Sequence, residues 1–131
     1  MNEALNLRTL AGLLGRDIQS SDGISVGRLI EILFESSTQR PVWLGVAPSH
    51  GLVFNTLLVP AAGAVELTGV VRVQYENDII SNQPPTDHGE GFASASDERR
   101  LYGFFGLPLG EGTDLRVLHA GDDLPDSESV Y

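Results

Sequence analysis

Apolar and polar residues alternate along much of the first half of the chain, the pattern of strands that bury one face. The longest example covers residues 24–35, where one face carries the apolar residues Ile24, Val26, Ile30, Ile32 and Phe34. Leu29 and Leu33 fall on the polar face, and a bulge at residue 27 would shift the phase. A helix over residues 26–34 is the competing interpretation. The β-branched residues and the turn before this segment favour a strand.

The polar cluster at residues 20–23 separates this strand from a shorter one predicted at residues 13–19. Its last two residues are Asp22 and Gly23, and Asp-Gly is a strong hairpin signal because glycine tolerates the positive φ of a tight turn. The sequence therefore predicts a β-hairpin that turns at Asp22-Gly23.

Further short strands follow, bounded by proline, glycine or polar turns. They are expected at residues 42–47, 52–59, 65–67, 70–75 and 114–119. Short strands with a turn every 8 to 12 residues are typical of a small barrel or sandwich. We expect strands 52–59 and 70–75 at sheet edges. The fold class predicted is mainly β: a small antiparallel β-barrel with one short C-terminal helix and an acidic tail.

The helix is expected at about residues 95–105, after an aperiodic polar stretch. Ser94 with Asp97 forms a capping-box-like start, and Gly106 provides a stop. Leu101 and Phe105 are at helical spacing and would dock on the barrel. Phe104 and Phe105 cannot both face inward from one short helix.

The 131 residues suit one domain. We divide the chain into an N-terminal extension (1–9), the barrel domain (10–107) and an acidic, partly flexible tail (108–131). The tail carries six carboxylates against one arginine.

The charge balance narrows the classes of partner. All eight cationic residues are arginine, and the formal net charge is −10. Such a surface repels nucleic acid and anionic membranes, so neither is expected as a partner. Cysteine is absent, which excludes disulfides and thiolate metal sites. The N-terminus lacks the pattern of a secretory leader, and no apolar run is long enough to span a bilayer, so we expect a cytoplasmic protein.

Six segments in this order resemble the PRC-barrel family, which includes the cytoplasmic domain of the photosynthetic reaction-centre H subunit and the C-terminal domain of RimM-type ribosome maturation factors. The segments cover residues 14–18, 22–28, 41–46, 58–64, 71–75 and 97–106. The resemblance implies a non-enzymatic protein-binding or assembly module. The chain has neither a membrane helix nor a second N-terminal barrel, so neither relative's full architecture carries over.

Catalytic and metal chemistry have weak support in the sequence. No serine lies in a nucleophile elbow, and the three histidines show no paired-ligand spacing. The densest ligand-like group is Asp87, His88 and Glu90, which is either a weak cation site or an ordinary solvated loop. We expect no catalytic residue, cofactor or metal. The alternatives are a ribosome- or RNA-associated factor and a small ligand-binding or hydrolytic barrel.

Five apolar residues are candidates for a protein interface. Strand parity places Trp43 on the face of its strand opposite to that of Leu44. Trp43 therefore either packs at a barrel end or anchors a partner. Phe104 is a candidate because Phe104 and Phe105 cannot both face inward from the short helix. The other three are Val53, Phe54 and Leu57, which together with Leu58 cannot all point into so small a core. This surplus predicts a symmetric homodimer, unless the C-terminal helix or the strand at 114–119 covers it.

Overall fold

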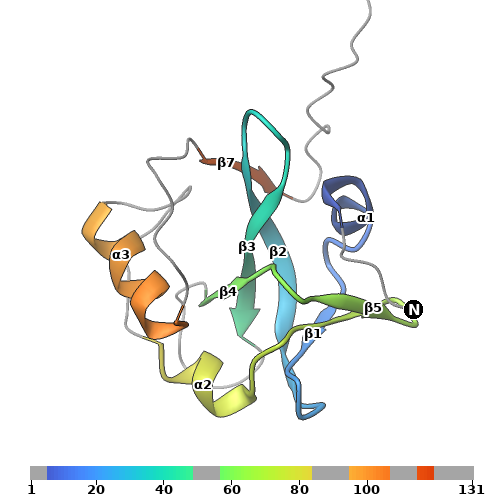
Figure 1. Cartoon of the computed structure of the whole chain (residues 1–131). Coiled ribbons are helices and arrows are strands. Elements are labelled where there is room, and N and C mark those ends of the chain that lie inside the picture. The colour runs from blue at the N-terminus through green and yellow to red at the C-terminus, as the bar shows by residue number, and fades with distance from the viewer. Residues whose placement is uncertain (1–5, 49–56, 84–94, 107–114, 120–131) are drawn as a thin grey trace, which may run out of the picture.

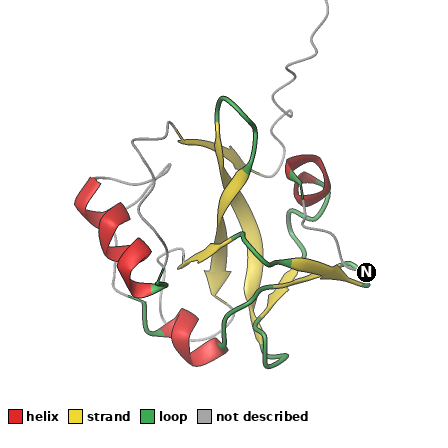
Figure 2. Ribbon diagram, viewed as in Figure 1, coloured by secondary structure: helices red, strands yellow, loops and turns green. Residues whose placement is uncertain are grey.

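The computed structural model describes residues 6–48, 57–83, 95–106 and 115–119 (Figure 1). Over these ranges the chain is mainly β, with one seven-stranded mixed sheet and three helices around it (Figure 2). The helices are α1 (Leu7–Ala11), α2 (Asn77–Ser81) and α3 (Ala95–Phe104). The strands are β1 (Asp17–Gln19), β2 (Ser25–Glu35), β3 (Pro41–Pro48), β4 (Leu57–Pro60), β5 (Val65–Leu67), β6 (Val70–Arg72) and β7 (Leu115–His119).

The strands follow the order β4-β3-β2-β1-β6-β5, and β7 pairs with β2. β2 is long enough to pair with β1 through its first residues and with β7 through its last. Every pair is antiparallel except β1 with β6, which is parallel. β4 and β5 stand at the two ends of this order, so the described strands form an open, mixed sheet rather than a purely antiparallel one.

The predicted hairpin is confirmed between β1 and β2. Gly23 has a φ of +83°, a positive value that glycine adopts without the strain that a Cβ would cause. Its N–H donates to the Ser20 carbonyl at 3.0 Å, and the Ser20 N–H donates to the Ile24 carbonyl at 2.9 Å. The turn is therefore closed by its own backbone.

The segment before the hairpin differs from expectation. A strand was predicted over residues 13–19, but only Asp17–Gln19 is a strand, and residues 12–15 turn. Upstream lies α1, in part of the expected extension. Asn6 caps it by accepting a hydrogen bond from the Thr9 N–H at 2.8 Å. Leu7 and Leu10, three residues apart, are buried, so packing of one helix face stabilises this short element.

β2 has apolar side chains buried on both faces. Its register with β3 shifts between Leu29 and Glu31, which makes Ile30 an extra residue. A second shift, in the pairing with β1, falls beside Gly27, where a change of phase was expected. Leu29 and Leu33, both predicted on the polar face, are fully buried. The bulge turns Leu29 into the main core, and α3 covers the face that carries Leu33.

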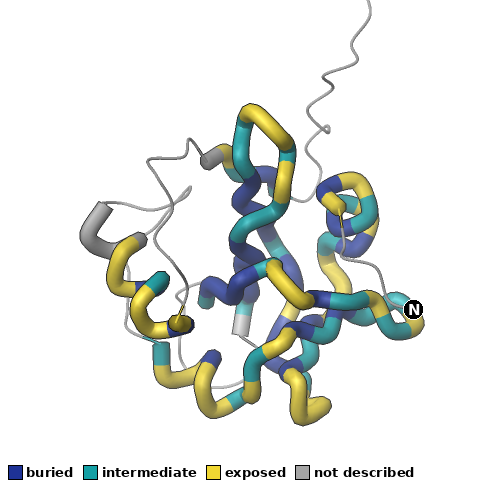
Figure 3. The backbone as a smooth tube through the Cα atoms, in the orientation of Figure 1, coloured by how far each residue is buried: buried dark blue, intermediate teal, exposed yellow. Residues whose placement is uncertain are grey.

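Two apolar cores lie on opposite faces of the sheet. The main core is enclosed by the curved sheet, α1 and α2, and Figure 3 shows the central strands as its buried part. Its members are Leu7, Leu10, Leu13, Ile18, Val26, Leu29, Ile32, Phe34, Leu44, Val46, Val59, Ala64, Val71, Val73, Ile80 and Leu118. The second core lies under α3 and consists of Leu33, Trp43, Leu58, Leu101 and Phe105. The helix predicted at 95–105 is thus confirmed, and it docks through the expected residues.

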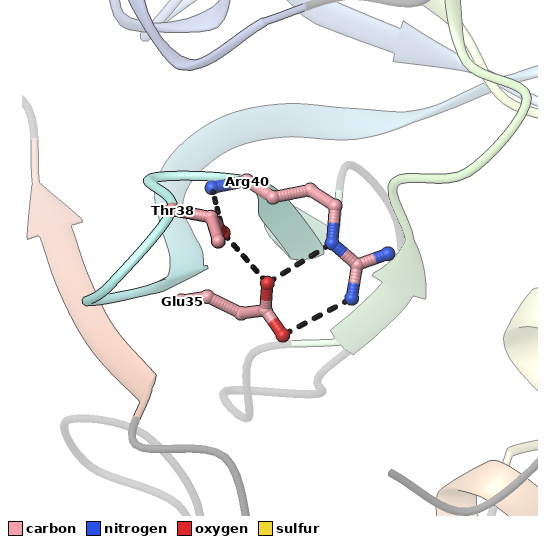
Figure 4. A network of polar contacts seen from close by, with 3 residues as sticks. All are labelled: Glu35, Thr38 and Arg40. Atoms are coloured by element: carbon pink, nitrogen blue, oxygen red, sulfur yellow. Dashed lines mark hydrogen bonds and ion pairs between the residues drawn. The ribbon is translucent and has the colours of Figure 1, made fainter.

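The turn between β2 and β3 is held by a polar network (Figure 4). The Glu35 carboxylate accepts hydrogen bonds from Nε of Arg40 at 3.1 Å, from a terminal guanidinium nitrogen at 3.1 Å, and from the Thr38 hydroxyl at 2.7 Å. The paired guanidinium and then the hydroxyl hold the pKa of Glu35 below its usual value. The network fixes the turn, and nothing in it points to chemistry.

One expectation about sheet edges is wrong. β6 was predicted at an edge, but it lies between β1 and β5. Its partner β1 is more than fifty residues away in sequence, and such a parallel pairing has no local signal. The other expected edge strand is present as β4, and the predicted strand near the C-terminus is present as β7.

Candidate functional site

Three large apolar side chains stay exposed in the described part of the chain. They are Ile24 at 45%, Ile79 at 40% and Phe104 at 37%. Ile24 directly follows the β1–β2 turn, Ile79 lies on α2, and Phe104 is the last residue of α3. A cluster of exposed apolar residues is the usual mark of an interaction surface, so their relative positions matter.

Two hydrogen bonds join the hairpin to α2 and to Tyr75 just before it. The Ser21 N–H donates to the Tyr75 carbonyl at 2.9 Å. The Asn77 N–H, at the first residue of α2, donates to Oδ1 of Asp22 at 3.2 Å. The element that carries Ile24 is therefore fixed against the element that carries Ile79.

Aromatic contacts join the end of α3 to the same place. The Tyr75 and Phe105 rings meet edge to face with centroids 5.0 Å apart, and Phe105 and Phe104 do the same at 5.0 Å. Tyr75 and α2 thus lie between the hairpin tip, at the bottom of the molecule in Figure 1, and the last turn of α3, at its left. We call the group Ile24, Ile79 and Phe104 the apolar end.

Carboxylates surround the hairpin and α2 part of the apolar end. Asp22, Glu76 and Asp78 are all exposed, and residues 20–27 and 73–83 contain no arginine. The half-buried Arg72 reaches the turn from β6, where a terminal guanidinium nitrogen lies 3.8 Å from the position of a Cβ at Gly23. Hydrogen bonds from the Ser20 hydroxyl and then from the Asn77 N–H lower the pKa of Asp22, so this carboxylate keeps its charge in mild acid. On α3, Arg99 and Arg100 are exposed and precede Phe104.

Trp43 belongs to the second core and not to a surface. It is fully buried, and its ring lies 5.4 Å from Tyr102 and 5.9 Å from Phe105, centroid to centroid. Of the two interpretations that parity left open, packing is the one that the structure shows. α3 covers the face of β3 that carries Trp43, so this face is buried.

The other interface candidates separate clearly. Val53 and Phe54 lie outside the described residues. Leu57 is half-buried and packs against the main core. Phe104 is exposed and belongs to the apolar end, while Phe105 is buried, as expected for two neighbours on a short helix.

Sequence reasoning missed two of the three members of the apolar end. Ile24 was assigned to the inward face of its strand, but it precedes β2 and follows the turn directly. Ile79 lies beside Ile80, which is fully buried. Adjacent isoleucines on so short a helix cannot both face the core, and this was the available signal.

Glu31 and His119 form the one notable titratable pair in the described chain. They lie opposite each other in the β2–β7 register, and Nε2 of His119 is 3.1 Å from Oε2 of Glu31. The Glu31 side chain is 4% exposed and that of His119 is 39% exposed. Oε1 of Glu31 is buried and has no hydrogen-bond partner within the described residues.

The carboxylate of this pair can fix the orientation of the imidazole ring through Nε2. Among the described residues, no further histidine, cysteine, aspartate or glutamate joins these two to make a three-ligand metal site. The candidate group Asp87, His88 and Glu90 lies outside the described residues, as does His50. The pair alone assembles no reaction centre.

No protein-family model matches this sequence, and no curated protein is similar enough to match it. None of the helices within the described ranges has the length and apolar character to cross a bilayer.

Proposed function

We propose that the chain is a non-enzymatic protein-binding or assembly module that presents the apolar end to a protein partner. The observation that carries this proposal is that Ile24, Ile79 and Phe104 are exposed on three elements that the hairpin, Tyr75 and Phe105 bring together. Aromatic and branched apolar side chains on a fixed scaffold are typical anchors of protein interfaces.

The proposal includes a PRC-type barrel as the scaffold. Three features support it: the resemblance over residues 10–107, the hairpin at Asp22-Gly23, and a helix near residue 100 that follows the strands in the expected order. The strong curvature of the sheet around the main core agrees with it as well. A cytoplasmic location and a homodimer belong to the same proposal.

Affinity capture from cells of the source organism tests the binding function. The wild-type chain is compared with Ile79→Ser/Phe104→Ser, which removes two anchors from exposed positions. The matched control is Arg16→Ser/Glu66→Ser, which also changes two exposed residues, at a distance from the apolar end along the sheet. We expect one protein to be recovered with the wild type and the control, and lost with the double serine variant.

Recovery of the same proteins with all three chains would overturn the proposal. The rival functions have their own readouts in this experiment. RNA recovered with the wild type at physiological salt would favour the ribosome-associated alternative. A bound metabolite would favour the small ligand-binding or hydrolytic alternative, and the Glu31–His119 pair is where its chemistry would be sought first.

A further inference from the structure

We infer that the apolar end binds a cationic amphipathic segment of its partner, a stretch in which apolar side chains are flanked by lysine or arginine. The inference rests on the proposed function and specifies the chemistry of the partner. Its basis is the charge distribution around Ile24 and Ile79.

The apolar side chains supply the contact with the partner, and the carboxylates determine which charge that partner carries. Ile24 and Ile79 lie on segments whose exposed charges are Asp22, Glu76 and Asp78. One cation lies near these three carboxylates: the half-buried Arg72, whose guanidinium reaches the turn at Gly23. Carboxylates still outnumber it, and a surface with an excess of one sign steers and selects partners of the opposite sign. The exposed arginines of α3 precede Phe104, so the negative side is that of the hairpin and α2.

Asp22 is held in place as a charged group. Its carboxylate accepts hydrogen bonds from the Ser20 hydroxyl and from the Asn77 N–H. A carboxylate fixed by two donors can still accept from a third, because each of its oxygens has two lone pairs. A partner's ammonium or guanidinium group would therefore meet an ordered charge beside Ile24.

A second copy of the chain fits this surface less well. Each copy carries a formal charge of −10, and a contact through the hairpin and α2 would bring the same carboxylates toward each other. Like charges in a contact reduce affinity and suppress that partner. The occupant that the charges favour is a basic one.

Binding of a defined peptide tests the inference. The probe is a fluorescent amphipathic peptide of about 18 residues built from leucine and lysine, and its negative counterpart has glutamate for lysine. The key variant is Glu76→Gln/Asp78→Asn. The matched control is Asp17→Asn/Glu66→Gln, because all four residues are exposed and each double variant removes two carboxylates from the same net charge of −10.

We expect the lysine peptide to bind the wild type and the control equally. Glu76→Gln/Asp78→Asn should bind it about two- to tenfold more weakly, and added salt should reduce this difference. Phe104→Ala should weaken binding by about tenfold or more. The glutamate peptide should not bind. Circular dichroism confirms that each variant is folded.

Equal loss in the two double variants would overturn the inference, because it would show attraction to net charge alone. Absence of binding by the lysine peptide would overturn it too. The two proposals can fail separately. If the cellular partner is lost with Ile79→Ser/Phe104→Ser but retained with Glu76→Gln/Asp78→Asn at every salt concentration, the binding function stands and the cationic partner is wrong.

Discussion

The side-chain amide of Gln83 pairs with both backbone groups of Leu58. The Leu58 N–H donates to Oε1 of Gln83 at 2.9 Å, and Nε2 of Gln83 donates to the Leu58 carbonyl at 2.8 Å. A residue of a neighbouring strand would offer the same donor and acceptor. Gln83 thus takes the place of a strand beside β4.

This contact closes the outer edge of β4 over its described length. The Ala61 N–H donates to the Val42 carbonyl at 2.9 Å, so alternate residues of this strand face β3. The backbone groups of Leu58 and Pro60 point away from β3, toward the outer edge of the sheet. Gln83 occupies the N–H of Leu58, and proline has none. The outer edge of Leu57–Pro60 therefore has no N–H free to pair with another strand, and the homodimer predicted from surplus apolar surface stays a prediction.

Gln83→Ala should reopen that edge. Loss of both hydrogen bonds from partly buried groups should lower the free energy of unfolding by about 1–3 kcal/mol, and the bare edge should promote association. Chemical denaturation and sedimentation velocity measure the two effects. The control is Asn82→Ala, which removes an exposed hydrogen bond that the Asn82 side-chain amide donates to the Asp78 carbonyl. If Gln83→Ala were no less stable than the control, the strand-like role of Gln83 would be wrong.

Phe105→Ala should loosen α3 from the sheet. Phe105 is buried against Trp43, so truncation should cost about 3 kcal/mol. Phe104→Ala, one residue away but exposed, should cost less than about 1 kcal/mol. Trp43 is the only tryptophan, so its fluorescence reports on this core directly. Quenching by acrylamide should rise in Phe105→Ala and not in Phe104→Ala, and equal quenching in both would contradict the second core.

Gly45→Ala should strain the sheet at Glu31. A Cβ at position 45 would lie 2.2 Å from Cγ of Glu31, so one of the two must move. Overpacking of this kind costs about 1–3 kcal/mol. The cost should fall by at least half when Glu31 is already alanine, a coupling that a double-mutant cycle measures.

Gly103→Ala is the control for that cycle. Among the described residues, no atom outside the backbone of α3 itself and the two neighbouring residues lies within 4 Å of a Cβ at position 103, so alanine there should stabilise the helix by about 0.5–1 kcal/mol. Equal destabilisation at positions 45 and 103 would show that glycine flexibility, and not the contact with Glu31, decides the result.

The Asp22 carboxyl should titrate below its ordinary pKa of 3.8. A pKa lowered by folding means that the carboxylate stabilises the fold above the unfolded value, near pH 4, and that this contribution is lost as the pH falls through the folded value. The stability difference between wild type and Asp22→Asn should thus be constant at neutral pH and disappear in acid. Ser20→Ala should raise the Asp22 pKa in an NMR titration. A wild-type midpoint above 4 would contradict the contact.

The elements with local signals could be predicted from the sequence. The Asp22-Gly23 turn, the long strand β2 and helix α3 each carry their own turn, alternation or capping pattern. Features that depend on distant residues could not be predicted. The burial of Trp43 and Leu33 requires α3, and the internal position of β6 requires a parallel partner far away in sequence. The phase of β2 depends on bulges that only the opposing strands define.

The apolar end was out of reach for the same reason. Phe104 was named as an interface candidate because its neighbour takes the inward position. Ile24 and Ile79 join it only once the hairpin tip is bonded to α2 and Tyr75 packs on Phe105. The pairs Ile79-Ile80 and Phe104-Phe105 each indicate one outward side chain, but neither pair shows that the outward side chains share one surface.

Site-specific photo-crosslinking tests the central claim, that the apolar end is the surface that binds a protein partner. A photoreactive phenylalanine analogue replaces Ile79 or Phe104 in the full chain, and Arg28, an exposed residue of β2, serves as the control position. After irradiation in cells of the source organism, we expect the same partner protein to be crosslinked from positions 79 and 104 and not from 28. Crosslinks from neither of the two positions, or the same products from all three, would contradict the account.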